Sequence, residues 1–200
     1  MSTSLHLKRI ACALVIFGSL ILIWQWRLAA TVALPALIQA GLIGQAADER
    51  LDSDGLRYPA LGIQVPLTEA AWTSPLNAQD WTEIRSALRN GVSLAYTEPT
   101  FAEAPLAFMT GHSSDVTAHR YASVFAGLGQ AQVGDQFFIQ LGDATYPYTV
   151  ADRRVLNPGD IEAFRALGPS NDRQRVVLVT CWPVLTTKAR LVVIGERADL

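Results

Sequence analysis

An uncharged apolar stretch near the N-terminus constrains this chain most. Residues 10–26, IACALVIFGSLILIWQW, form a run of seventeen residues without a charge, which is the lower limit for a helix that crosses a bilayer. Lys8 and Arg9 precede the run, and basic residues before an apolar span favour a cytoplasmic N-terminus. Trp24 and Trp26 lie at its far end, where interfacial aromatic residues are common. The stretch predicts one N-terminal transmembrane helix, hence a single-pass protein of the cell membrane.

Two other interpretations of this stretch stay open at the sequence level. A cleaved signal peptide would have a shorter apolar region and a cleavage site, for which residues 28–30 (Leu-Ala-Ala) are a weak match. A buried helix of a soluble protein is the second. The anchor fits the length and flanks best, so we expect residues 1–45 to form a cytoplasmic tip and anchor. Polar residues 46–60 would be a linker, and residues 61–200 one domain outside the cytoplasm.

The charge of the remainder excludes one class of partner. From Leu51 onward the chain has twelve Lys and Arg residues and sixteen Asp and Glu residues, a net charge of −4. Proteins that bind nucleic acids need clustered positive charge to neutralise phosphates. We therefore expect no nucleic-acid partner.

Short β-rich runs separated by turn residues dominate this exported part. Extended runs are expected at residues 61–67, 105–112, 175–181 and 189–196, with a hairpin at 133–156 around the turn residues 141–144. Short helices are expected at residues 77–91, 120–129 and 157–168. Many short strands with a few short helices predict a mainly β fold, either a closed barrel or a sandwich.

The chain has only two cysteines, and they lie in different segments. Cys12 is within the expected anchor and Cys181 ends the apolar run RVVLVT, so the two are not expected to form a disulfide. A lone cysteine in an exported domain is either a free reactive thiol or an intermolecular bridge. Burial as a small apolar side chain is an equally common fate. Position alone does not choose among these.

A cysteine nucleophile needs an imidazole partner and a donor for the developing oxyanion. The exported part offers two histidines, His112 after the apolar run 105–110 and His119 in a polar loop, and spacing alone does not choose between them. Arg190 opens the last expected strand, and Cys181 ends the one before it. If these two strands are neighbours, both residues lie at the same edge of the sheet. An arginine there can donate hydrogen bonds to a carbonyl oxygen, or it can pair with a surface carboxylate.

The ordered set MTGHSS (residues 109–114), LVTCWP (178–183) and ARLVVIG (189–195) resembles the sortases. These are membrane-anchored cysteine transpeptidases of bacterial cell surfaces. The resemblance covers residues 61–196, and its strength lies in the order and separation of Gly-His, Thr-Cys and Arg rather than in any one motif. It implies a sortase-like closed β-barrel with a few short helices, preceded in the chain by the N-terminal transmembrane helix.

The resemblance also implies roles for individual residues. Cys181 would be the nucleophile, His112 the catalytic histidine and Arg190 the arginine that stabilises acyl transfer. Thr180 and Trp182 flank the nucleophile and would contact substrate, although many sortases carry a small or acidic residue where Trp182 stands. His119 then becomes a loop residue.

The implied reaction has two steps and needs no cofactor and no metal. Cys181 attacks a Leu-Pro-X-Thr-Gly-like sorting signal at the C-terminus of another exported protein and forms a thioester. An amine of a peptidoglycan precursor or of a pilin then takes the acyl group.

Two rival classes remain at this level. A wall cross-linking cysteine transpeptidase typically has Gly before its nucleophile and Arg soon after it, whereas here Thr180 precedes Cys181 and no arginine follows until Arg190. An anchored β-domain without catalytic activity would not require the cysteine, histidine and arginine to converge.

Overall fold

The fold is taken from a computed structural model that describes residues 53–68, 84, 86–96, 98–115, 117, 119–168 and 173–198, with five single positions nearer the N-terminus. Apart from those five positions, the expected anchor lies outside the described residues, as do residues 46–52 of the expected linker. Within the described part of the chain, no helix is both long and apolar enough to cross a membrane.

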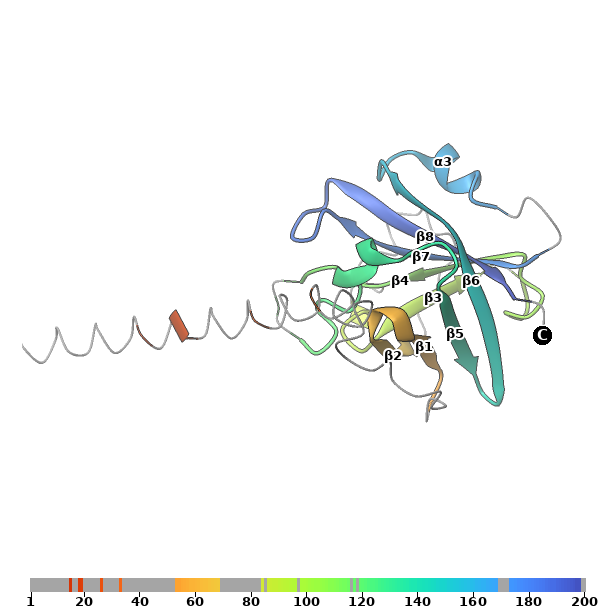
Figure 1. The fold of residues 1–200 in the computed structure, drawn as a ribbon, viewed down its shortest axis with the longest axis horizontal. Helices are drawn as coiled ribbons and strands as arrows, with labels where there is room; N and C mark the ends of the chain where they lie inside the picture. The colour runs from red at the N-terminus through yellow and green to blue at the C-terminus, as the bar shows by residue number, and fades with distance from the viewer. Residues whose placement is uncertain are drawn as a thin grey trace, which may run out of the picture.

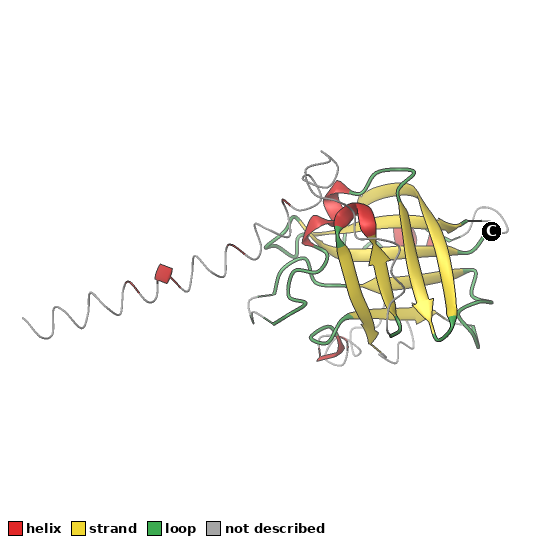
Figure 2. Cartoon of the chain, turned by 60° about the horizontal axis from the view of Figure 1, so that its bottom comes forward, coloured by secondary structure: helices red, strands yellow, loops and turns green. Residues whose placement is uncertain are grey.

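Eight strands close into a barrel, in the order β1-β2-β3-β4-β7-β8-β6-β5 (Figures 1 and 2). The strands are β1 (Gly55–Tyr58), β2 (Ile63–Thr68), β3 (Val92–Tyr96), β4 (Leu106–Thr110), β5 (Gln136–Leu141), β6 (Ala144–Leu156), β7 (Arg175–Trp182) and β8 (Ala189–Arg197). Short helical segments are η1 (Pro59–Leu61), η3 (Ala126–Gln130) and α3 (Ile161–Arg165). The mainly β closed barrel expected from the sequence is confirmed.

Two of the neighbouring strand pairs, β2–β3 and β4–β7, are parallel, and the others are antiparallel. The parallel pair β4–β7 matters most for the site, because the carboxyl ends of parallel neighbours lie at the same edge of a sheet. Figure 1 shows β4, β7 and β8 side by side.

The first strand lies where the sequence indicated a linker. β1 (Gly55–Tyr58) pairs with both β2 and β5, so it belongs to the barrel rather than to a connection before it. Leu56 and Tyr58 belong to the core and Arg57 lies between them, an alternation too short to be recognised beside the polar residues before it. The Arg57 guanidinium stacks 4.4 Å from the centre of the Phe138 ring, and this cation–π contact covers it. A charged residue here therefore does not mark a solvated segment.

The helix expected at residues 120–129 does not form as a regular α-helix. The chain forms turns there and then the 3₁₀ segment η3. Gly127 and Gly129 weaken a regular α-helix in this run. The backbone N–H of Phe125 donates to the carbonyl of His112 at 2.9 Å, which directs the segment toward the loop after β4.

Strand β7 is buried on both faces, which explains its uninterrupted apolar sequence. Val176 and Leu178 belong to the core cluster inside the barrel. Val177 and Val179 pack on the outer face in a second cluster that includes Leu167, which follows α3. Because side chains alternate along a strand, the same alternation puts Thr180 on the inner face and Cys181 on the outer face.

Candidate functional site

Cys181 and Arg190 face each other across neighbouring strands. They are opposed in the antiparallel register of β7 and β8, where directly opposite Cβ atoms lie about 4.5–5.5 Å apart. Both side chains are half-buried, and Cys181 is a free thiol. The expectation that these two residues meet at one edge of the sheet therefore agrees with the observed register.

The guanidinium of Arg190 is oriented by backbone oxygens. Its Nη1 donates to the carbonyl of Thr187 at 3.2 Å and to the carbonyl of Ala189 at 3.1 Å. Among the described residues, no carboxylate forms an ion pair with Arg190. The contacts observed for this side chain are the two backbone carbonyls. Arginine has five N–H donors, so donors other than those on Nη1 can serve a second oxygen.

His112 reaches the same end of the barrel through the parallel pair β4–β7. Thr110 of β4 is in register with Val179 of β7, and the ladder extends one residue further through a 3.2 Å bond from Gly111 N to Val179 O. His112 follows directly, just as Cys181 follows Thr180 on β7. The ends of β4 and β7 and the start of β8 therefore bring His112, Cys181 and Arg190 to one edge.

Thr180 joins the two strands that carry the thiol and the imidazole. Its side chain is 2% exposed, and its hydroxyl donates to the carbonyl of Gly111 at 2.8 Å. The bond links the residue before Cys181 to the residue before His112. Direct contact of Thr180 with substrate stays a prediction, and its observed contact is structural.

Two glycines permit close packing beside the site. A Cβ on Gly111 would lie 2.6 Å from the ring of buried Phe125, and a Cβ on Gly129 would lie 2.6 Å from the ring of Trp182. Real Cβ atoms do not approach that closely, so a side chain at either position would displace an aromatic ring. Trp182 packs against the barrel core in this way. Its role as a wall of a substrate groove stays a prediction.

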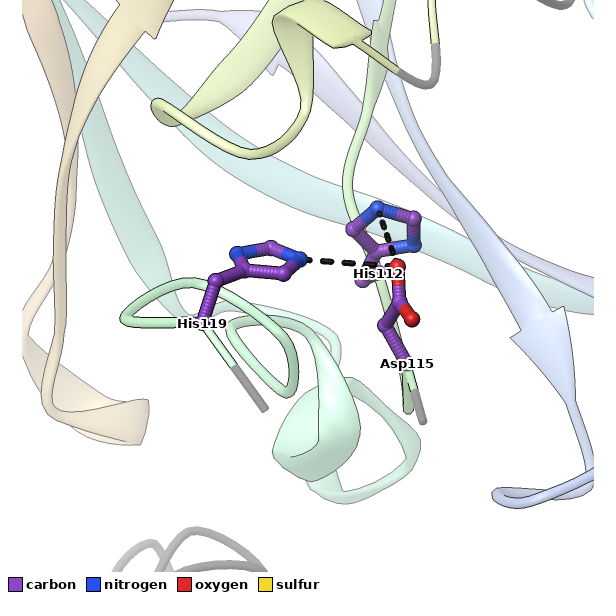
Figure 3. Close-up of side chains that lie close together, drawn as sticks. All are labelled: His112, Asp115 and His119. Carbon is purple, nitrogen blue, oxygen red and sulfur yellow. Dashed lines mark ion pairs between the residues drawn. The ribbon is translucent and has the colours of Figure 1, made fainter. Parts of the chain in front are cut away.

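The loop after β4 holds two histidines against one carboxylate (Figure 3). Oδ2 of Asp115 lies 3.5 Å from Nε2 of His112 and 3.5 Å from Nε2 of His119. The centres of the two imidazole rings are 5.4 Å apart, in an edge-on arrangement. His119 is therefore a direct neighbour of the His112–Asp115 pair and not an isolated loop residue.

The surroundings of Asp115 favour its charged form, the carboxylate. Partial burial alone would raise its pKa, but the N–H and hydroxyl of Thr117, followed by His112 and His119, lower the pKa below its usual range. Both Thr117 bonds go to Oδ1 at 2.8 Å. Sequence reasoning missed Asp115, although a carboxylate three residues after one histidine and four before another was a usable signal.

A closed β-barrel that gathers a free thiol, an imidazole and an arginine at one edge has the groups that thiol-dependent acyl transfer requires. A family model described as the sortase domain matches residues 56–198. The chain therefore belongs to the sortase family, whose members are cysteine transpeptidases.

Solved structures of sortases are similar to this chain. Sortase C-1 from Actinomyces oris has 21% identity and a TM-score of 0.57, with 83% of this chain and 84% of that chain covered. Sortase C1 of Streptococcus agalactiae has 21% identity and a TM-score of 0.57, with 86% and 87% covered. A lid mutant of sortase A from Corynebacterium diphtheriae has 18% identity and a TM-score of 0.58, with 88% and 96% covered. At these identities the likeness concerns the fold. Among curated proteins no match is found.

Proposed function

We propose that this sortase cleaves a sorting signal of exported proteins with Cys181 as nucleophile, His112 as acid and base, and Arg190 as donor to the reacting carbonyl. The observation that supports this most is the register of the strands. Cys181 is opposed to Arg190, and His112 extends the parallel neighbour of the strand that carries Cys181. The rival idea of a scaffold without catalytic activity gives no reason for this grouping.

The chemistry follows from these three groups. The Cys181 thiolate attacks the carbonyl carbon of a Thr–Gly-like peptide bond, and an S–C bond forms as the carbonyl oxygen becomes anionic. The C–N bond then breaks, and the His112 imidazolium gives its proton to the departing amine, leaving a thioester. In the second step an acceptor amine attacks the thioester after His112 removes its proton, and the Cys181 thiolate is released.

Substrate, acceptor and location belong to the same proposal. The donors would be exported proteins with a Leu-Pro-X-Thr-Gly-like C-terminal signal, and the acceptor an amine of a peptidoglycan precursor or a pilin. Trp182 would form part of the wall that receives the signal, and Thr180 would support it. Residues 1–45 would anchor the enzyme, and the polar residues after them would hold the barrel outside the cell membrane.

Detection of the thioester intermediate tests this function. Full-length protein in detergent is mixed with a panel of Leu-Pro-X-Thr-Gly-like peptides, and its intact mass is measured in samples quenched with acid at short times. We expect a mass increase equal to the acyl part of one peptide, lost when a nucleophilic amine is added. The Cys12→Ala variant should gain the same mass and the Cys181→Ala variant none. An adduct that survives in Cys181→Ala, or a quenched time course without adduct or cleavage for every peptide, would contradict the proposal.

Arg190→Lys should reduce kcat/KM by about 100-fold, the usual cost of losing one oxyanion donor. Lysine retains the positive charge but lacks the planar fork of donors that reaches both backbone carbonyls and a substrate oxygen. Peptide cleavage rates of the two proteins at equal folded concentration give the ratio. Arg153→Lys, a change of the same kind on strand β6, is the control. A rate for Arg190→Lys close to that of the control would leave Arg190 with a structural role only.

A further inference from the structure

We propose that His112, Asp115 and His119 also form a binding site for a divalent transition metal such as Zn²⁺, and that the bound metal blocks the reaction by occupying His112. One ligand atom from each of the three residues lies within 4.8 Å of the other two. All three point toward one another in Figure 3. The binding itself is independent of the proposed function, whereas its inhibitory effect depends on it.

The two separations between the carboxylate and the imidazoles match those between ligands of one tetrahedral metal ion. Zinc binds histidine nitrogen at about 2.0–2.1 Å and carboxylate oxygen at about 2.0–2.2 Å, so two ligands on a tetrahedron lie roughly 3.4 Å apart. Asp115 Oδ2 is 3.5 Å from each imidazole Nε2. The two imidazole ligand atoms lie within 4.8 Å of each other, so rotations of the side chains would complete the geometry.

The Asp115 carboxylate is already oriented for metal binding. Oδ1 of Asp115 accepts two hydrogen bonds from Thr117, one from the backbone N–H and one from the hydroxyl. This leaves Oδ2 directed at both imidazoles. A hydrogen-bonded carboxylate of this kind is the outer-shell support that metal ligands commonly have.

The environment of the His119 ring nitrogens also favours a ligand. Both of its ring nitrogens are inaccessible to solvent, and within the described part of the chain neither has a hydrogen-bond partner. Its 3.5 Å separation from Asp115 is too long for a strong hydrogen bond. A buried polar group without a hydrogen bond is costly, and coordination through Nε2 would satisfy one of these nitrogens.

The donor set selects the kind of metal. Two imidazole nitrogens and one carboxylate oxygen suit Zn²⁺ and its neighbours in the transition series better than Mg²⁺ or Ca²⁺, which prefer oxygen ligands. Three protein ligands leave a fourth position for water. Because the same Nε2 of His112 cannot hold a metal and carry a proton, metal binding and proton transfer through that atom exclude each other.

Binding is measured first, without the thiols. In the full-length Cys12→Ala/Cys181→Ala protein, calorimetric titration with ZnCl₂ should give one zinc per chain, and CoCl₂ should give the visible absorption of tetrahedral Co²⁺. The chain has three histidines, so His6→Ala is the matched control and should bind zinc like its parent. His119→Ala and Asp115→Asn should each weaken binding at least about 100-fold, because even outer-shell changes cost 10- to 100-fold. Circular dichroism verifies that each variant is folded.

Inhibition is measured second, with both cysteines restored. Zinc should stop acyl transfer at the concentration at which it binds, a chelator should restore it, and His119→Ala should need at least about 100-fold more zinc. No zinc binding by the thiol-free parent, or equal binding by His119→Ala, overturns the site. Equal zinc sensitivity of the two active proteins shows inhibition through another group and overturns the inhibitory role. An inactive metal-free enzyme would instead count against the proposed function, and the binding result would stand.

Discussion

Cys181→Ala is expected to lose acyl transfer by at least about 10⁴-fold, because removal of a covalent nucleophile also removes the group that the rest of the site serves. The half-buried thiol leaves only a small gap when it is truncated, so the barrel should remain folded. Steady-state cleavage of a preferred peptide gives the loss, and the thermal midpoint verifies the fold.

The second cysteine makes a matched control. Cys12→Ala removes the same atom at a position in the expected anchor and should keep its rate. Turnover by Cys181→Ala above about one part in a thousand would remove Cys181 from the mechanism. A general failure of both variants would indicate an effect on folding rather than on chemistry.

His112→Ala is expected to cost about 10³-fold or more, in the range that general acid–base catalysis supplies. His119→Ala is expected to cost at least about 10-fold less than His112→Ala, although its ring is close by, because only His112 directly follows the strand that is parallel to β7. Both variants are assayed with a chelator present, so that metal does not contribute.

The comparison is informative because the two imidazoles share one carboxylate. If Asp115 were the important partner and either ring could serve, the two losses would be similar. If His119→Ala lost more than His112→Ala, the assignment of the catalytic histidine would be reversed. Peptide KM separates a loss of binding from a loss of chemistry in each variant.

The sequence predicted the strands that carry the site because their patterns are local. β7 and β8 are long apolar runs, and the hairpin of β5 and β6 turns at Gly142, whose φ of 56° favours glycine. The order of the strands around the barrel does not follow from such patterns. β7 lies between β4 and β8 because of contacts between segments that are far apart in the chain.

The site was predictable to a similar degree. Cys181 ends one strand and Arg190 starts the next, and the connection between them is short. Their positions opposite each other could therefore be inferred from the sequence. The distinction between His112 and His119 came from a family resemblance rather than from spacing. The Asp115 carboxylate between them was missed, since its contact with both rings depends on a loop that no periodic pattern describes. Thr180 was expected to touch substrate, and its contact with the Gly111 carbonyl depends on the β4–β7 pairing.

The bond from Thr180 to Gly111 spans 69 residues of sequence, and this separation has a consequence for biosynthesis. Long-range parallel pairing is slow to form, since the entropy cost of closing a long loop comes before the stabilising contacts between the strands. A nascent chain carries its thiol far from His112 until β7 docks beside β4. If Cys181 and His112 act together as proposed, a chain that has not completed its barrel has the cysteine without its imidazole, and the active centre would form only with the barrel. Acylation of Cys181 would then have to wait until the barrel is complete, which would protect the unfinished chain.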